Sequence, residues 1–285
     1  MSSAKPLPFS TLIGNPKARN ILTRLLANHA LPSVLLFYGT DGVGKGLFAL
    51  EIARFLVDNP KKDHPDIHIL KPDPKSDQHP IATIRALLQE ASLPPFEAPC
   101  KIFIIHDAEK MLPTSSNALL KTLEEPPPRT RFILLTSQIE SLLPTIVSRC
   151  CRIPFFPIGD DELATFVTEK CRTQEGKKIA LFAQGSIAYA LHRASNPKSL
   201  PLDELFRAKS YVELVEKLSK IEEPPEEATG TEIDHLFEEI LYWIREHDPL
   251  QLDKAIPLIA EARMALNHHV KFKNVLEHFF LNFLT

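Results

Sequence analysis

VLLFYGTDGVGKG, residues 34–46, joins a short apolar run to a glycine-rich segment, and a helical pattern follows it. The glycine-rich half, with Gly39, Gly42 and Gly44 before Lys45, matches the phosphate-binding motif G-x-x-x-x-G-K-[ST] at every fixed position but the last. In that motif, backbone amides surround phosphate groups and the lysine reaches the outer phosphates. The stretch therefore predicts a strand, a phosphate-binding loop (P-loop) and a helix, in that order.

The last position of the motif holds Gly46 in place of serine or threonine. The hydroxyl at that position normally holds magnesium, so we expect the loop to keep its phosphate contacts and to lose a direct metal ligand. A purely structural strand-to-helix turn is the alternative interpretation of these glycines.

Two further apolar runs, at residues 102–105 and 132–135, alternate with helical patterns. Continuous apolar strands separated by helices are typical of a parallel sheet that is buried on both faces. The sequence predicts an α/β P-loop base over residues 1–156. Beyond it the pattern is amphipathic and helical, which predicts a small helical lid over 157–202 and an all-α domain over 203–285.

Composition and charge limit the function classes. The net charge is −3 and the pI is near 6.4, so the chain lacks the basic footprint of a protein that binds DNA alone. The N-terminal residues lack the pattern of a signal peptide, and no stretch approaches the roughly 18 apolar residues of a spanning helix, so we expect a cytoplasmic protein. The four cysteines form no CxxC pair, which favours reduced thiols.

The apolar run at 102–105 ends in His106-Asp107-Ala108-Glu109. A magnesium-dependent P-loop enzyme carries acidic residues at this place, which organise the metal and the attacking water. Asp107 is the candidate here, and a solvated turn is the equally simple alternative. His106 is a poor magnesium ligand, because this hard cation prefers oxygen.

Two segments mean little when taken alone. The stretch NALLKTLEEPP, residues 117–127, predicts a helix that ends before prolines. Arg149, in the tripeptide Ser148-Arg149-Cys150, follows a short helical pattern beside the sheet, where an arginine is more often a surface or salt-bridging residue than a catalytic one.

Together these segments resemble the bacterial clamp-loader AAA+ family of DNA polymerase III over nearly the full chain. The most specific matches are residues 117–127 followed by Ser148-Arg149-Cys150, with further matches in the P-loop and in Phe9 with Ile13-Gly14-Asn15. Within the family, residues 64–67, 84–85 and 105–111 are most similar to the delta prime subunits.

The resemblance implies a role for each matched residue. Arg149 would be an arginine finger that points to a neighbouring subunit's ATP, and Thr136 would be the sensor of the chain's own site. Three departures point to a degenerate nucleotide site: Gly46, the missing second carboxylate beside Asp107, and Ala188, where a motor subunit usually has arginine. We therefore expect weak ATP binding without hydrolysis, and no required cofactor.

The resemblance also implies partners. The chain would be a stationary subunit of a hetero-pentamer with delta and gamma/tau subunits, within the DNA polymerase III holoenzyme. It would help to load the sliding clamp onto primed DNA, with any DNA contact shared or indirect, and residues 203–285 would form the helical collar that holds the complex together. The alternatives are an ATP-hydrolysing gamma/tau-like motor and, from another class, a small-molecule P-loop kinase.

The zinc module that is common in the family is not expected here, because residues 58–80 contain no cysteine. Three histidines in this segment, His64, His68 and His79, raise the question of a metal site. Their proline-rich surroundings favour a loop instead.

Overall fold

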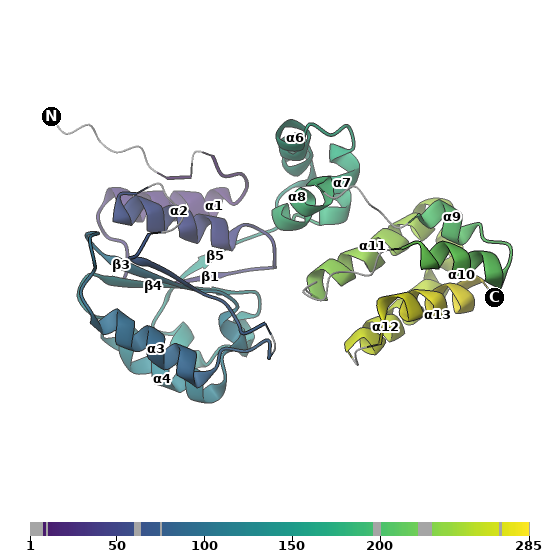
Figure 1. Cartoon of the computed structure of the whole chain (residues 1–285). Helices are drawn as coiled ribbons and strands as arrows, with labels where there is room; N and C mark the ends of the chain where they lie inside the picture. The colour runs from purple at the N-terminus through teal and green to yellow at the C-terminus, as the bar shows by residue number, and fades with distance from the viewer. Residues whose placement is uncertain are drawn as a thin grey trace. The chain divides into compact units, whose positions relative to one another are not determined.

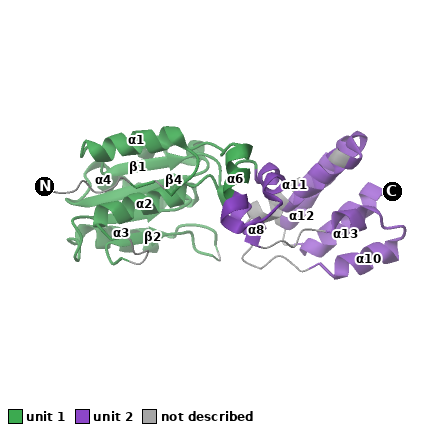
Figure 2. Cartoon of the chain, turned by 90° about the horizontal axis from the view of Figure 1, so that it is seen from above, with its two compact units in different colours: residues 1–166, 184–188 green, residues 167–183, 189–285 purple. Residues whose placement is uncertain are grey.

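The computed structural model describes residues 8–9, 11–59, 64–74, 76–195, 201–221, 230–267 and 270–284. They fall into two compact units, one within residues 1–166 and 184–188 and the other within 167–183 and 189–285 (Figure 2). The predicted boundaries of base, lid and collar, near 156 and 203, stay predictions. Within the described residues, no helix is long and apolar enough to cross a membrane.

The first unit contains the predicted parallel sheet. Its strands lie in the order β2-β3-β4-β1-β5, and every neighbouring pair is parallel. In register, Val34 of β1 lies opposite Phe132 of β4, and Leu35 lies opposite Cys151 of β5. The elements in chain order are α1 (Pro16–Ala27), β1 (Val34–Tyr38), α2 (Lys45–Val57), β2 (Ile67–Leu70), α3 (Ile81–Ser92), β3 (Lys101–Ile105), η1 (Ala108–Lys110), α4 (Pro113–Glu124), β4 (Thr130–Thr136), η2 (Ile139–Ser141), α5 (Pro144–Val147), β5 (Cys151–Pro154) and the first part of α6 (Asp160–Cys171).

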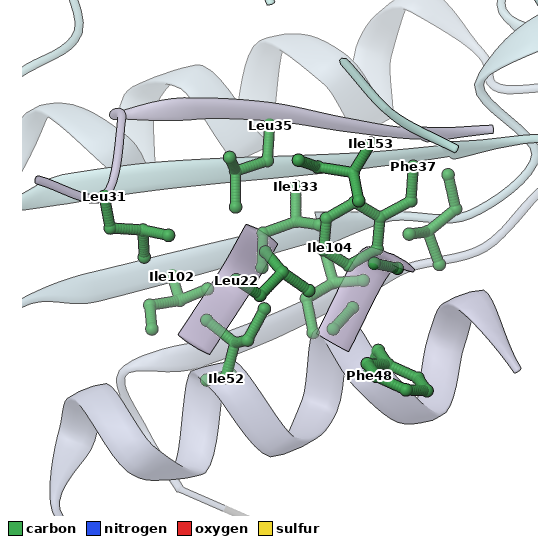
Figure 3. Packing of buried hydrophobic residues seen from close by; sticks show 14 of the residues in the cluster. Leu22, Leu31, Leu35, Phe37, Phe48, Ile52, Ile102, Ile104, Ile133 and Ile153 are labelled. Atoms are coloured by element: carbon green, nitrogen blue, oxygen red, sulfur yellow. The ribbon is translucent and has the colours of Figure 1, made fainter. Parts of the chain in front are cut away.

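Helices cover both faces of this sheet, as continuous apolar strands require. Leu35 and Phe37 of β1 point into a core with α1 and α2, whereas Val34 and Leu36 point into a core with α3 and α4. Figure 1 shows the two helix pairs on opposite faces, and Figure 3 shows the packing of the first core. This alternation of successive side chains is the geometry of a strand, and it makes the sheet the centre of the unit.

Two edge strands were missed by the sequence pattern. β2 lies inside the segment that we expected to be a proline-rich loop, and β5 follows Arg149. Edge strands are hydrogen-bonded on one side only and stay partly exposed, so their sequences are shorter and less apolar than those of central strands. His68 and Arg152 interrupt these two runs for that reason.

The second unit is helical. It contains the end of α6, α7 (Gly176–Ala183), most of α8 (Ile187–Ser195), α9 (Leu202–Phe206), α10 (Tyr211–Ser219), α11 (Gly230–His247), η3 (Pro249–Gln251), α12 (Leu252–Asn267) and α13 (Phe272–Leu284). Its core buries apolar residues that include Leu205, Ile240, Leu276, Phe279 and Phe280, whereas Val212 is exposed. Glu239 of α11 is buried and accepts hydrogen bonds from Tyr189 Oη (2.9 Å) and Arg193 Nε (3.0 Å) of α8. This network joins α8 to the later helices.

Asp66, just before β2, stabilises the loop between α3 and β3 through hydrogen bonds. Its carboxylate is fully buried and accepts hydrogen bonds from the backbone N–H groups of Phe96 (2.6 Å), Glu97 (3.0 Å) and Ala98 (2.9 Å). Burial acts to raise the pKa of Asp66, but these three donors outweigh it and hold the pKa below its usual value. The ionised carboxylate therefore stabilises the folded chain.

We expect Asp66→Asn to lower the free energy of unfolding by about 3 kcal/mol at neutral pH, because a buried charge-assisted network is lost. A carboxyl pKa that is lower in the folded chain gives stability that is present above the unfolded-state pKa and is lost as the pH falls through the folded-state pKa. Urea unfolding at neutral pH and below about pH 3 should thus show a difference that shrinks in acid. The exposed Asp77→Asn is the control, and an equal difference at both pH values would contradict the assignment.

Candidate nucleotide site

The predicted P-loop lies where the sequence places it, between the end of β1 and the start of α2. Gly42 has a φ of +76°, and a Cβ there would lie 1.8 Å from the Ser186 hydroxyl oxygen. The start of α8 packs against this side of the loop, where the N–H of Ala188 donates to the carbonyl of Gly42 (3.2 Å). The first turn of α8 therefore rests on the P-loop, and position 188 belongs to the site.

Asn15 holds the other side of the loop. Its side chain is buried, donates to the carbonyl of Val43 (2.9 Å) and accepts from the N–H of Phe156 (2.7 Å). It thereby joins the start of α1, the P-loop and the segment after β5. Its position in the matched Ile13-Gly14-Asn15 stretch was the only sequence signal, and the contact that explains it comes from the fold.

Lys45 is directed back into its own loop. Its ammonium group donates to the carbonyls of Gly39 (2.5 Å) and Thr40 (2.8 Å), and Asp41 lies 3.5 Å away. Burial lowers the pKa of Lys45, although Asp41 acts in the opposite direction. A phosphate group that enters the loop must therefore replace hydrogen bonds that Lys45 already makes.

The carboxyl end of β3 brings His106 and Asp107 to the same edge of the sheet as the P-loop. Asp107 has a φ of +47°, a backbone conformation that aspartate tolerates better than most residues. Burial raises the pKa of Asp107, and Lys110, 3.9 Å from its carboxylate, opposes the shift. A single carboxylate with a raised pKa is a weaker cation ligand than the acidic pair of a motor subunit.

Glu109 is the site residue that the sequence did not single out. Its Oε1 accepts from the backbone N–H (3.0 Å) and the hydroxyl (2.6 Å) of Ser137, just beyond β4. Burial acts to raise the pKa of Glu109, but the hydrogen bonds from Ser137 outweigh it, so the pKa lies below its usual value. Only Ala108 separates Glu109 from Asp107, and the turn of η1, which contains Glu109, brings its side chain back to the sheet.

Thr136, the predicted sensor, is fully buried at the end of β4. Its backbone carbonyl accepts from the N–H of Gly39 (3.3 Å), and its hydroxyl accepts from the N–H of Gln138 (3.1 Å). The end of β4 thus contacts the first residue of the P-loop. The structure therefore brings together the P-loop, Asp107 and Thr136, and adds Asn15, His106 and Glu109.

Arg149 lies outside this cluster. Its guanidinium bonds to the carboxylate of Glu124, with Nε 2.8 Å from Oε1, and Nη1 donates to the carbonyl of Thr145 (2.8 Å). None of its described hydrogen bonds reaches the P-loop, and its side chain is 32% exposed. The residue is available at the surface near the ends of α4 and α5.

The three histidines do not meet. His64 lies beside Glu97 (3.2 Å), His68 stacks on Phe103, and Nε2 of His79 lies 2.7 Å from the carbonyl of His106. No cluster of three metal-binding side chains occurs among the described residues, and the four cysteines, all of which are described, are free thiols.

The fold and the site define an AAA+ type of P-loop protein: a parallel five-stranded sheet with the P-loop after β1, followed by helical segments. A gamma-subunit-related DNA polymerase III protein from Thermotoga maritima has the same fold, with a TM-score of 0.60 at 20% identity over 93% of this chain and 98% of that one. The RuvB Holliday junction branch migration motor of the same organism gives a TM-score of 0.53 at 15% identity, over 85% of this chain and 79% of that one.

Residues 14–159 match the family model described as "DNA polymerase III, delta subunit". The chain belongs to this family of clamp-loader AAA+ proteins. Among its relatives are the DNA polymerase III subunit delta' of Bacillus subtilis, 30% identical over 64% of this chain and 59% of the relative, and the subunit gamma/tau of Mycoplasma pneumoniae, 30% identical over 64% of this chain and 30% of the relative. The chain thus spans less than two thirds of the length of these relatives.

Proposed function

We propose that the chain is a delta-prime-like, stationary subunit of a DNA polymerase III clamp loader. In this role it lends Arg149 to the ATP site of a neighbouring subunit and does not hydrolyse ATP itself. The partners would be delta and gamma/tau subunits in a hetero-pentamer that places the sliding clamp on primed DNA. Relatives named delta' and gamma/tau are equally similar in sequence, so the choice between them rests on the site.

The proposal rests on one contrast, between the residues that would bind the chain's own nucleotide and the arginine that would reach a neighbouring subunit's nucleotide. The residues that would hold the chain's own nucleotide include Gly46 where a hydroxyl is needed and the single acid Asp107 where a carboxylate pair is expected, and the ammonium group of Lys45 donates hydrogen bonds to its own loop. The residue that would act on a neighbouring subunit's nucleotide, Arg149, is present and lies at the surface. Such a chain is suited to complete another subunit's site, since a trans arginine stabilises charge on a transferred phosphoryl group.

The second candidate is an ATP-hydrolysing motor of the gamma/tau kind, and Glu109 favours it. This carboxylate has a lowered pKa, and its Oε2 is buried with no hydrogen-bond partner among the described residues. A buried, unsatisfied carboxylate oxygen beside a P-loop suits a role toward water or a cation. The two candidates differ in one measurable property, which is turnover by the isolated chain.

We expect the purified chain to hydrolyse ATP no faster than the background rate, with or without magnesium. The reason is that the site offers neither the hydroxyl nor the carboxylate pair that a metal-dependent P-loop enzyme uses. The measurement is phosphate release by the isolated protein and by its Lys45→Ala and Glu109→Gln variants. Magnesium-dependent turnover of about 1 per second, an ordinary enzymatic rate, that disappears in either variant would establish the motor instead.

A further inference from the structure

The backbone conformation at position 46 does not account for the presence of a glycine there. Gly39, Gly42 and Gly44 have φ values of +142°, +76° and +102°, which favour glycine, whereas Gly46 lies within α2 and has no such φ. Glycine inside a helix is unfavourable relative to alanine. Some other feature must therefore account for the missing side chain at this position.

The feature that a side chain at position 46 would meet is the ring of His106. A Cβ at residue 46 would lie 3.1 Å from Cε1 and 3.9 Å from Nε2 of His106, and 3.9 Å from Leu135 Cδ1. The first of these contacts is tighter than most Cβ contacts in proteins, so a side chain at position 46 would press on the ring. The imidazole thus occupies the space beside the first turn of α2, where the hydroxyl of the phosphate-binding motif belongs.

Hydrogen bonds on both sides hold the backbone of His106, from which the ring projects. The N–H of His106 donates to the carbonyl of Leu70 on β2 (2.8 Å), and its carbonyl lies 2.7 Å from Nε2 of the fully buried His79. Because a carbonyl only accepts, Nε2 of His79 carries the proton. The hydroxyl of Ser115 in turn donates to the carbonyl of His79 (2.9 Å). The position of His106 is therefore fixed from two sides.

The imidazole offers little to a magnesium ion. Burial lowers the pKa of His106 to about 4, and the charges of Lys71, His79 and Lys45 add to the shift. The ring is neutral at physiological pH and presents nitrogen, whereas magnesium prefers oxygen in an octahedral arrangement. Of the nearby carboxylates, Asp107 lies 3.9 Å from the ammonium group of Lys110, and Oε1 of Glu109 accepts both hydrogen bonds from Ser137. Oε2 of Glu109 has no hydrogen-bond partner among the described residues, and one such oxygen falls short of the octahedral set of oxygen ligands that magnesium prefers. The residues present do not fit a magnesium-bound nucleotide.

We infer that His106 fills the position of the nucleotide-bound divalent cation, and that Gly46 is its steric counterpart. The two residues act as a pair, so ATP binds this P-loop no better with magnesium than without it. A hydroxyl at position 46 does not repair the site unless the ring is also removed. The inference deepens the proposed function by naming what excludes the metal from the degenerate site.

The test is ATP binding to the purified full chain, measured by calorimetry with excess magnesium and with EDTA. We expect equal affinity, or none, in both conditions for the native chain and for Gly46→Ser. The double variant Gly46→Ser/His106→Asp should bind ATP at least about tenfold more tightly with magnesium than with EDTA, since it restores the hydroxyl and a carboxylate. Magnesium-enhanced binding by the native chain or by Gly46→Ser alone would overturn the inference, and so would a folded double variant without that gain.

A stability measurement tests the same pair without nucleotide. Gly46→Ala should lower the melting temperature of the native chain, because its methyl group meets the ring. In a His106→Ala background the same change should raise the melting temperature by roughly 2 °C or more, because alanine favours helix. Equal shifts in the two backgrounds would show that residues 46 and 106 are independent. Both tests use the isolated chain, so they can fail while the role of Arg149 stands.

Discussion

In the proposed hetero-pentamer, replacement of Arg149 by alanine is expected to slow ATP hydrolysis at one neighbouring site by about a hundredfold or more. This figure lies below the roughly 10³ to 10⁵ that a trans arginine contributes in related phosphoryl-transfer enzymes. The guanidinium is held by Glu124 at the surface, and a partly exposed ion pair of this kind contributes little net stability. The guanidinium can therefore readily leave Glu124 and bind phosphate oxygens, which the planar fork of arginine contacts in a bidentate manner.

The measurement is steady-state hydrolysis and clamp loading by pentamers in which only this subunit carries the change. The other motor sites keep turning over, so total hydrolysis falls only in part. Arg152→Ala is the matched control, because Arg152 is an exposed arginine three residues further along, on β5. Arg149→Lys keeps the charge without the fork and should recover only part of the rate. If hydrolysis and loading by the alanine variant match those of the native complex, Arg149 is an ordinary surface residue.

The second large effect is expected at α12. Ile256 and Met264 are 55% and 58% exposed, and with Ala260 between them they form an apolar stripe at a spacing of four residues. The opposite side of the same helix, with Ala255, Ile259 and Ala262, is buried in the core of the unit. If residues 203–285 hold the pentamer together, as proposed, this stripe is a surface that a partner subunit would cover.

We expect Ile256→Asp/Met264→Asp to raise the concentration needed for assembly by at least about tenfold, which corresponds to about 1.4 kcal/mol. The melting temperature of the isolated chain should change little, because exposed side chains contribute little to folding. Lys220→Asp, at the exposed residue that follows α10, is the control. Deletion of residues 203–285 is a weaker test, because it also removes Glu239, the hydrogen-bond partner of Tyr189 and Arg193. The deletion would therefore disturb α8 as well as any interface. Unchanged assembly of the double variant would show that the stripe is not an interface.

The agreement between sequence and structure is best where local chemistry decides the outcome. Each of the three central strands contains a continuous apolar run because helices cover both faces of the sheet, and the P-loop is recognisable because its glycines and lysine have fixed spacing. The edge strands β2 and β5 escaped detection, because strands that are paired on one side carry polar residues such as His68 and Arg152.

In the candidate site, too, some features follow from local sequence and others only from tertiary contacts. The sequence by itself determined the fold class, the P-loop, the missing hydroxyl at Gly46 and the family, because each depends on residues that are close together along the chain. Only the tertiary structure decided that His106 faces Gly46, that Glu109 bonds to Ser137, and that Arg149 is paired with Glu124. These contacts join residues 25 to 60 positions apart, on strands and helices that meet only after the sheet has formed, so no local pattern carries them.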